Sequence, residues 1–198
     1  MKKYTKQDIH EVARAFINHE IIALPTDTVY GVGVVYGDVN DLEKLKHAKH
    51  RPETKPIPMM VSNIETMEQV AIVDDRTKKI VDHFLPGALT LVLPVKDNVP
   101  SDYTNGLSTI AIRIPDEEFI LNLINELQRP LLVTSANQSG QNTALTSQDV
   151  FEQLPNIDGI VLGTCKALQA STILDLSKEK MSVLREGPIS LEDIESVL

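Results

Sequence analysis

Polar residues that could do chemistry follow two short apolar runs of this 198-residue chain. The segment PTDTVYG, residues 25–31, comes directly after the apolar residues 21–24, and TSANQSG, residues 134–140, follows the apolar run that begins at Leu131. Hydroxyls and amides at the ends of strands often line binding sites. The alternative is an ordinary turn, in which Asp27 and the neighbouring threonines bond to local backbone groups, and the segment alone leaves both interpretations open.

Positive charge is concentrated in one stretch of an otherwise acidic chain. The chain has 19 Lys and Arg against 28 Asp and Glu, a formal net charge of -9, whereas residues 44–55 hold five basic residues and one acid. Lysines at the end of a helix complement its dipole, which accounts for Lys46 and in part for Lys49. It does not account for Arg51 and Lys55, which follow in a loop stiffened by proline. Charges that converge from such a loop favour a bound polyanion.

One arginine stands inside an apolar strand pattern. In TIAIRIP, residues 109–115, the two-residue period of a strand puts Thr109, Ala111 and Arg113 on one face. A buried arginine needs an anion. That anion is either a structural carboxylate such as Asp116 or the carboxylate or phosphate of a ligand.

Missing motifs narrow the chemistry further. The segment AST, residues 170–172, and Arg185 add hydroxyls and a cation, but the sequence has no Ser-His-Asp set, paired carboxylates or metal-ligand cluster. The glycines Gly31, Gly33 and Gly37 miss the dinucleotide-binding spacing by one residue, and no P-loop motif occurs. Close backbone packing is therefore the favoured role of Gly31 and Gly33. The remaining chemistry is binding of an anionic ligand, with catalysis by positioning and charge stabilisation, as in phosphoryl or nucleotidyl transfer.

The length and composition of the chain limit its possible architecture and cellular compartment. The length fits one domain of residues 1–198. No apolar run reaches the roughly 18 to 20 residues that cross a bilayer, and the N-terminal residues lack the apolar region of a signal peptide. The single cysteine, Cys165, can form neither an internal disulfide nor a cysteine-based zinc site. We therefore expect a cytoplasmic protein with no membrane segment and no protein-held metal.

Helices and strands alternate along the predicted domain. Helices are expected near residues 5–19, 41–50, 63–72, 75–84, 116–128, 147–154 and 190–198, and strands near 21–24, 90–95, 109–114, 131–134, 159–162 and 172–176. Thr5 and Ser190 are the expected N-caps of the first and last helices, and Pro52 is expected to end the second helix. Strands 159–162 and 172–176 have no helix between them, so an antiparallel pair is expected. The prediction is an α/β fold with a twisted, mixed parallel and antiparallel sheet and flanking helices.

Seven motifs, in order, carry a resemblance to a known family. They are PTDTVYGVG, KHRPETKPIP, FLPGALTLVL, STIAIRIP, TSANQSG, STILDL and LREG. From about residue 20 to 187 the chain resembles the TsaC/YrdC family of threonylcarbamoyl-AMP synthases. The resemblance implies an open, twisted α/β fold and a reaction in which L-threonine, bicarbonate and ATP give threonylcarbamoyl-adenylate and pyrophosphate. Downstream threonylcarbamoyltransferase proteins would then use the adenylate to form N6-threonylcarbamoyladenosine next to the anticodon of tRNA.

The same resemblance assigns two sets of binding residues, position by position. It places ATP and its phosphates on Lys49, Arg51, Lys55, Thr109, Asn137 and Arg185, with Lys49 and Arg51 catalytic, and threonine on Thr28, Arg113, Ser135 and Ser171. In the reaction that the resemblance implies, the threonine amine captures carbon dioxide or bicarbonate as a carbamate and a carbamate oxygen attacks the α-phosphorus, so the enzyme is expected to supply no nucleophile. Arg113 is expected to pair with the threonine carboxylate, and Mg²⁺ is expected to arrive with ATP.

Three positions depart from the family pattern. His50 stands where glycine is common, which requires that the backbone there avoid positive φ. Met60 stands where many relatives have a histidine near the threonine, and Ala170 where some have Glu or Pro. An RNA-binding or ribosome-maturation module with weak affinity for RNA is the main alternative, against which the net charge of -9 counts. A carbamoyltransferase domain that makes carbamoyl-adenylate is disfavoured by the length and the single cysteine.

Overall fold

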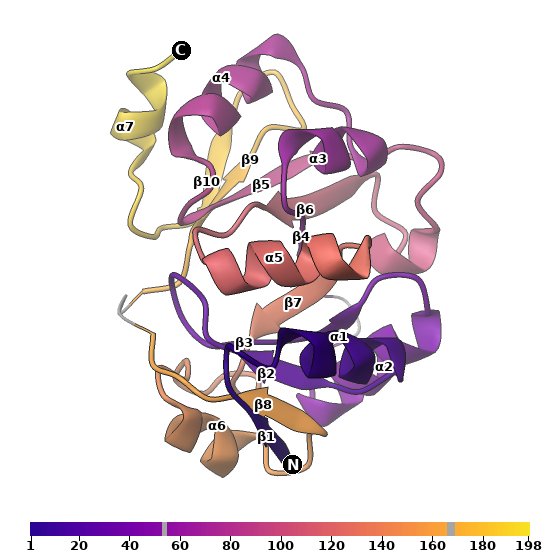
Figure 1. Ribbon diagram of the computed structural model, residues 1–198. Coiled ribbons are helices and arrows are strands. Elements are labelled where there is room, and N and C mark those ends of the chain that lie inside the picture. The colour runs from indigo at the N-terminus through magenta and orange to yellow at the C-terminus, as the bar shows by residue number, and fades with distance from the viewer. Residues whose placement is uncertain (53–54, 166–168) are drawn as a thin grey trace.

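A mixed β-sheet of ten strands runs through the part of the chain that the structure describes, and helices pack on its faces (Figure 1). The computed structural model describes residues 1–52, 55–165 and 169–198, so Glu53, the one acid of the basic stretch, lies outside it. The predicted α/β class with a mixed sheet and flanking helices is confirmed. None of the described helices is long and apolar enough to pass through a bilayer.

The strand order separates two strands that the sequence analysis expected to pair. The strands are β1 Lys2–Tyr4, β2 Ile22–Leu24, β3 Gly31–Val35, β4 Met59–Met60, β5 Leu89–Pro94, β6 Thr109–Arg113, β7 Leu131–Ser135, β8 Gly159–Val161, β9 Thr172–Asp175 and β10 Ser182–Arg185, in the order β1-β8-β2-β3-β7-β4-β6-β5-β9-β10. β8 runs parallel to β1 and β2, whereas β9 runs parallel to β5 and antiparallel to β10. The expected antiparallel pair of 159–162 with 172–176 is therefore wrong. Ten residues separate β8 from β9, more than a hairpin loop needs, and the chain crosses the sheet instead.

Four strands lie outside the sequence prediction: β1, β3, β4 and β10. β1 carries two lysines, β4 has two residues and β10 is an edge strand, so none of these three shows a clear apolar alternation. Gly31 and Gly33 belong to β3 rather than to a loop after a strand. A Cβ on Gly33 would lie 2.5 Å from the carbonyl oxygen of Leu132 and 2.9 Å from the Val133 side chain. The close-packing role favoured for these glycines is thereby confirmed.

The predicted helices are present, with shifted ends. They are α1 Ile9–Ile17, α2 Val39–Ala48, α3 Ile64–Val70, α4 Asp75–Phe84, α5 Glu118–Leu127, α6 Ser147–Gln153 and α7 Leu191–Glu195, with the 3-10 helix η1 Ser101–Thr104. Thr5 is not the N-cap of α1, because Asp8 holds that position. The Asp8 carboxylate accepts hydrogen bonds from the Thr5 amide (2.7 Å) and hydroxyl (2.8 Å), so the two residues close a turn before the helix begins. Ser190 caps α7 as predicted, in a capping box with Asp193.

α2 ends at a left-handed residue rather than at proline. His50 has φ of 49°, and the Arg51 amide donates to the Lys46 carbonyl at 2.9 Å while the His50 amide donates to the His47 carbonyl at 3.1 Å. This pair of bonds is a Schellman motif, in which glycine is the usual left-handed residue. Pro52 as the residue that ends the helix is wrong, and the condition that His50 avoid positive φ is not met. Histidine is among the side chains that enter this region more readily than most.

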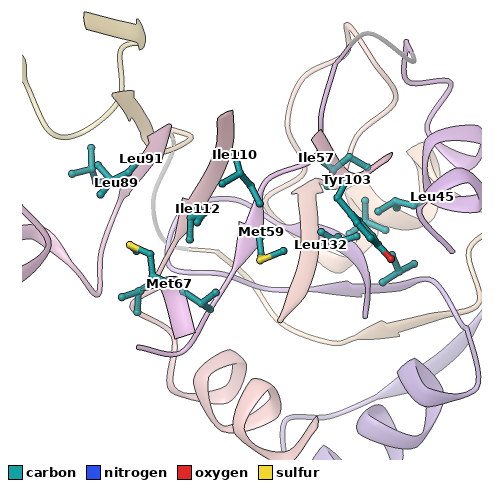
Figure 2. Packing of buried hydrophobic residues seen from close by; sticks show 14 of the residues in the cluster. Leu45, Ile57, Met59, Met67, Leu89, Leu91, Tyr103, Ile110, Ile112 and Leu132 are labelled. Atoms are coloured by element: carbon teal, nitrogen blue, oxygen red, sulfur yellow. The ribbon is translucent and has the colours of Figure 1, made fainter. Parts of the chain in front are cut away.

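Apolar side chains form two clusters, one on each face of the sheet. On one face, Phe16 of α1 and Leu123 of α5 pack against Val133 of β7, and the two helices lie side by side in Figure 1. On the other face, Met59 and Ile112 belong to the larger cluster shown in Figure 2. The sheet is therefore buried on both sides over most of its area, and only an uncovered part of a face can form an open site.

Candidate active site

A pocket of about 300 Å³ opens on the sheet face that α1 and α5 cover only in part. Val133 belongs both to the core under these helices and to the pocket lining. Alternate residues of neighbouring strands line it, among them Ala111 and Arg113 of β6 and Thr90 and Val92 of β5. The predicted facing of Ala111 and Arg113 to one side of the strand is confirmed.

Six of the ten residues that the family resemblance assigns to ligands line this one pocket. They are Thr28, Arg51, Arg113, Ser135, Ser171 and Arg185, and the departing residues Met60 and Ala170 line it too. The other four, Lys49, Lys55, Thr109 and Asn137, are not among the lining residues. No acidic residue occurs among the described residues that line the pocket, so its three guanidinium groups favour an anionic ligand.

Arg113 is buried and held by three acceptors. Its side chain is 5% exposed. Nε donates to the Gly87 carbonyl at 2.9 Å, Nη1 to the Thr28 hydroxyl at 2.9 Å and Nη2 to Oδ2 of Asp27 at 2.6 Å. Burial lowers the pKa of the Arg113 guanidinium, and the carboxylate of Asp27 opposes that shift. The structural carboxylate that the sequence analysis considered is thus Asp27, whereas Asp116 is exposed.

The turn in the PTDTVYG segment is held by hydrogen bonds of a threonine side chain. The Thr26 hydroxyl accepts a hydrogen bond from the Thr28 amide at 3.0 Å and donates to the Val29 carbonyl at 2.7 Å. The Asp27 carboxylate is directed to the arginine of β6 instead. The turn interpretation therefore holds for the hydrogen bonds of Thr26, and the interpretation as part of a site holds for both Thr26 and Thr28, which line the pocket.

Arg185 enters the pocket from a bulged edge strand. The β9–β10 register shifts between Val183 and Arg185, a distortion that re-aims side chains. The guanidinium donates to the Ser171 carbonyl through Nε at 3.0 Å and Nη2 at 2.7 Å, and Nη2 also donates to the Ser171 hydroxyl at 3.1 Å. Burial, and secondly the positive charge of Arg113, lower the pKa of Arg185. Two mutually repelling guanidinium groups thus lie in one pocket, which favours an anion between them.

Arg51 is anchored by backbone and hydroxyl oxygens. Its Nε donates to the Lys55 carbonyl at 3.0 Å, Nη2 to the Pro56 carbonyl at 2.8 Å and Nη1 to the Thr134 hydroxyl at 3.3 Å. Burial lowers the pKa of this guanidinium. No described carboxylate forms an ion pair with Arg51. The arginine therefore faces the pocket without a described counter-ion.

Lys49 lies behind the pocket and ties α2 to the TSANQSG loop. The residue is 1% exposed, and its ammonium group contacts the carbonyls of Ser135 and Asn137. Its own carbonyl accepts from the Ser139 amide at 3.2 Å. Burial, and secondly the positive charge of Arg51, lower the pKa of Lys49 to about 7. The predicted contact of Lys49 with ATP stays a prediction, since the structure places the side chain on the loop.

The other three assigned residues are also absent from the pocket lining. Asn137 is buried, and its Nδ2 donates to the carbonyls of Gln138 (2.8 Å) and Gln141 (2.9 Å), while Oδ1 has no hydrogen-bond partner. Lys55 is exposed in the loop after α2, and Thr109 begins β6 at partial burial. Their ATP contacts likewise stay predictions.

A histidine and two aspartates form a group that the sequence analysis missed. His19, Asp38 and Asp41 each offer a ligand atom within 4.8 Å of the others. They come from the turn after α1 and the start of α2, so no sequence spacing signals them. Nδ1 of His19 lies 2.7 Å from Oδ2 of Asp41, and Lys44 donates to Oδ1 of Asp41 at 3.3 Å. These groups satisfy one another at the opposite end of α2 from Arg51.

Comparison with known proteins identifies the family. The Sua5/YciO/YrdC family model, described as telomere recombination, matches residues 15–187. The chain belongs to this family. It is 35% identical over 194 residues to the threonylcarbamoyl-AMP synthase of Pyrococcus abyssi, covering 94% of this chain and 56% of that one. It is also 35% identical to the threonylcarbamoyl-AMP synthase of Bacillus subtilis, covering 96% and 56%. The chain thus spans little more than half the length of these family members.

A solved structure of the family extends the likeness to three dimensions. The crystal structure of P. abyssi Sua5 complexed with L-threonine superposes with a TM-score of 0.93 at 32% identity, covering all of this chain and 60% of that one. The matched family region, residues 15–187, includes all six assigned residues that line the pocket. The family resemblance drawn from the seven sequence motifs is confirmed.

Proposed function

We propose that the chain is an L-threonylcarbamoyladenylate synthase, a nucleotidyltransferase whose catalytic domain is residues 1–198. The observation that carries the proposal concerns five residues from segments far apart in the sequence, Thr28, Arg51, Arg113, Ser171 and Arg185. They line one pocket, and none of its described lining residues is acidic. A pocket of hydroxyls and guanidinium groups suits a ligand pair with a carboxylate and phosphates. Family members named threonylcarbamoyl-AMP synthase and the Sua5 complex with L-threonine support the choice of substrates.

Threonine would occupy the part of the pocket around Arg113. Its carboxylate would pair with this guanidinium, and Thr28, Ser135 and Ser171 offer hydroxyls for the polar groups of the amino acid. Met60 lines the same pocket and is 6% exposed. An apolar thioether at this place would pack against the aliphatic part of the substrate rather than bond to its hydroxyl.

ATP would place its phosphates toward Arg51 and Arg185, with Lys49, Lys55, Thr109 and Asn137 completing its binding site. Mg²⁺ enters as part of the nucleotide substrate. The threonine amine combines with carbon dioxide, with loss of a proton, or with bicarbonate, with loss of water, to form a carbamate. A carbamate oxygen then forms a bond to the α-phosphorus, and the bond from that phosphorus to the bridging oxygen of pyrophosphate breaks. Guanidinium groups with fixed positions offset the negative charge that develops on the phosphates.

The product is a mixed anhydride of a carbamate and AMP. Its place is upstream of a threonylcarbamoyl transfer to adenosine next to the anticodon of tRNA, carried out by threonylcarbamoyltransferase proteins in the cytoplasm. The threonine carboxylate is not consumed, so Arg113 could hold it throughout the reaction.

Pyrophosphate release by the purified chain tests the proposal. The assay contains ATP, Mg²⁺ and bicarbonate, with L-threonine, with L-serine or with no amino acid. We expect release that depends on bicarbonate and L-threonine and is weaker with serine. ATP binding without threonine-dependent release would contradict the proposal. RNA binding that falls steeply with salt, again without release, would favour the RNA-binding alternative.

A further inference from the structure

Asp27 stands directly behind the pocket without lining it. Its side chain is 12% exposed, and Oδ2 lies 2.6 Å from Nη2 of Arg113. Oδ1 is buried and has no hydrogen-bond partner. A buried carboxylate with one unpartnered oxygen is costly unless its charge is compensated. Its compensation here is the guanidinium of Arg113.

The local fold does not need the Asp27 carboxylate. The turn that contains it is held by the Thr26 hydroxyl, which bonds to the Thr28 amide and the Val29 carbonyl. The side chain of an aspartate in a turn usually accepts hydrogen bonds from nearby backbone groups. Because Thr26 forms the hydrogen bonds of this turn, the side chain of Asp27 pairs with Arg113 instead.

The three acceptors around Arg113 leave part of its guanidinium for a ligand. An arginine side chain has five N–H donors in a rigid plane. The carbonyl of Gly87, the hydroxyl of Thr28 and the carboxylate of Asp27 take one each. Asp27 is the one charged group of the three, so it contributes most to the orientation of the Arg113 guanidinium plane. It also compensates the positive charge of Arg113, which lies in the same pocket as Arg185.

We propose that Asp27 is a positioning residue for the amino-acid substrate, acting through Arg113 without touching the ligand. The inference rests on the proposed function, because it takes the threonine carboxylate as the group that Arg113 receives. Without the carboxylate of Asp27, the guanidinium turns toward other oxygens and adopts the binding orientation only part of the time. Apparent affinity falls in proportion to that fraction.

The substitution Asp27→Asn separates positioning from a general loss of structure. We expect the KM for L-threonine to rise about tenfold, because one partner of a buried charge pair is lost, while kcat and the KM for ATP change less than about twofold. Asp27→Glu retains the charge and should recover part of the threonine affinity. Asp116→Asn, an exposed acid close to Arg113 in sequence, is the matched control and should leave both KM values unchanged.

Calorimetric titration with L-threonine gives a second readout that does not depend on turnover. Wild-type protein that binds threonine, together with an Asp27→Asn variant that binds it equally well, would overturn the inference and leave the proposed function intact. Equal losses for threonine and ATP, with a lowered melting temperature and no recovery in Asp27→Glu, would also overturn it. Wild-type protein that neither binds threonine nor releases pyrophosphate would remove the proposed function and the inference with it.

Discussion

Arg113 and Arg51 enter the same pocket from very different surroundings. Arg113 lies within β6, deeply buried, with the Asp27 carboxylate against it. Arg51 lies in the loop after α2, where carbonyl oxygens and the Thr134 hydroxyl hold it and no described carboxylate pairs with it. The Arg113–Asp27 pair is close to neutral, whereas Arg51 has no described carboxylate to compensate its positive charge. Under the proposed function, the triphosphate, as the more highly charged ligand, would therefore lie toward Arg51.

Removing the Arg113 side chain tests the role of the buried Arg113–Asp27 pair, and we expect the largest effect from this substitution. Arg113→Ala leaves a buried carboxylate without its partner, which we expect to lower the free energy of unfolding by about 3–5 kcal/mol. Adding Asp27→Asn to this variant should restore part of the loss, because the lone buried charge disappears. Urea denaturation measures both changes. A loss below about 1 kcal/mol would show that the ion pair is not the stabilising element assumed here.

Removing Arg51 should affect turnover rather than folding. Its hydrogen bonds go to neutral oxygens, so Arg51→Ala leaves no unpaired buried charge. We expect threonine-dependent pyrophosphate release to fall about 10²–10³-fold, as when one charge-stabilising donor is removed from an active site. Thermal unfolding should stay close to the wild type. Unchanged turnover would take Arg51 out of the site and leave Arg185, Lys49 and Lys55 as candidates for the phosphates.

The burial of Lys49 next to Arg51 predicts a pH dependence of stability. Its pKa falls from 10.5 to about 7 on folding, so above pH 7 the unfolded chain binds a proton that the folded chain does not. Stability then rises with pH. Between about pH 7 and pH 8.5 we expect the wild type to gain about 1 kcal/mol per pH unit relative to Lys49→Met. A neutral amine keeps two N–H groups, enough for the two carbonyls it contacts.

Denaturant titrations of both proteins at several pH values measure this difference. Subtracting the Lys49→Met curve cancels other groups, such as Cys165, whose pKa is raised to about 11 by burial. A difference in the free energy of unfolding that does not change with pH would mean that Lys49 stays protonated while it contacts the two carbonyls.

The smallest expected effect comes from the left-handed backbone of His50, the residue before Arg51. His50 has φ of 49°, and His50→Gly should raise the free energy of unfolding by about 0.5–1 kcal/mol by relieving the left-handed conformation. The same change at His47, inside α2, should instead lower it by a similar amount. Chemical denaturation of the two variants gives both values, and destabilisation by His50→Gly would contradict the assignment of the helix end.

Sequence reasoning predicts the parts of this molecule that depend on local patterns. The helices expected near 75–84 and 147–154, the capping role of Ser190 and the shared facing of Ala111 and Arg113 follow from period and residue type. Strand partners do not, because β8 and β9 follow each other in sequence, whereas long-range pairing places them seven positions apart in the strand order.

In the site, too, the residues of local motifs can be predicted from the sequence, whereas contacts between distant residues cannot. Motif residues such as Thr28 and Ser171 are found from the sequence, and the structure brings them to one pocket. The pairing of Asp27 with Arg113 joins residues 86 positions apart, and no local pattern favours it over Asp116. The conformation of His50 depends on the hydrogen bonds that close α2, which a side-chain pattern does not encode.

The interleaved strand order also bears on how the pocket forms during folding. Its lining includes residues of β3, β4, β5, β6, β7, β9 and β10, and β4 lies between β7 and β6 although it precedes both in sequence. Contacts of such high sequence separation form late and slow the search for the native state. The pocket therefore exists only once the distant strands have paired, and a bound ligand should slow amide hydrogen exchange across all of them together.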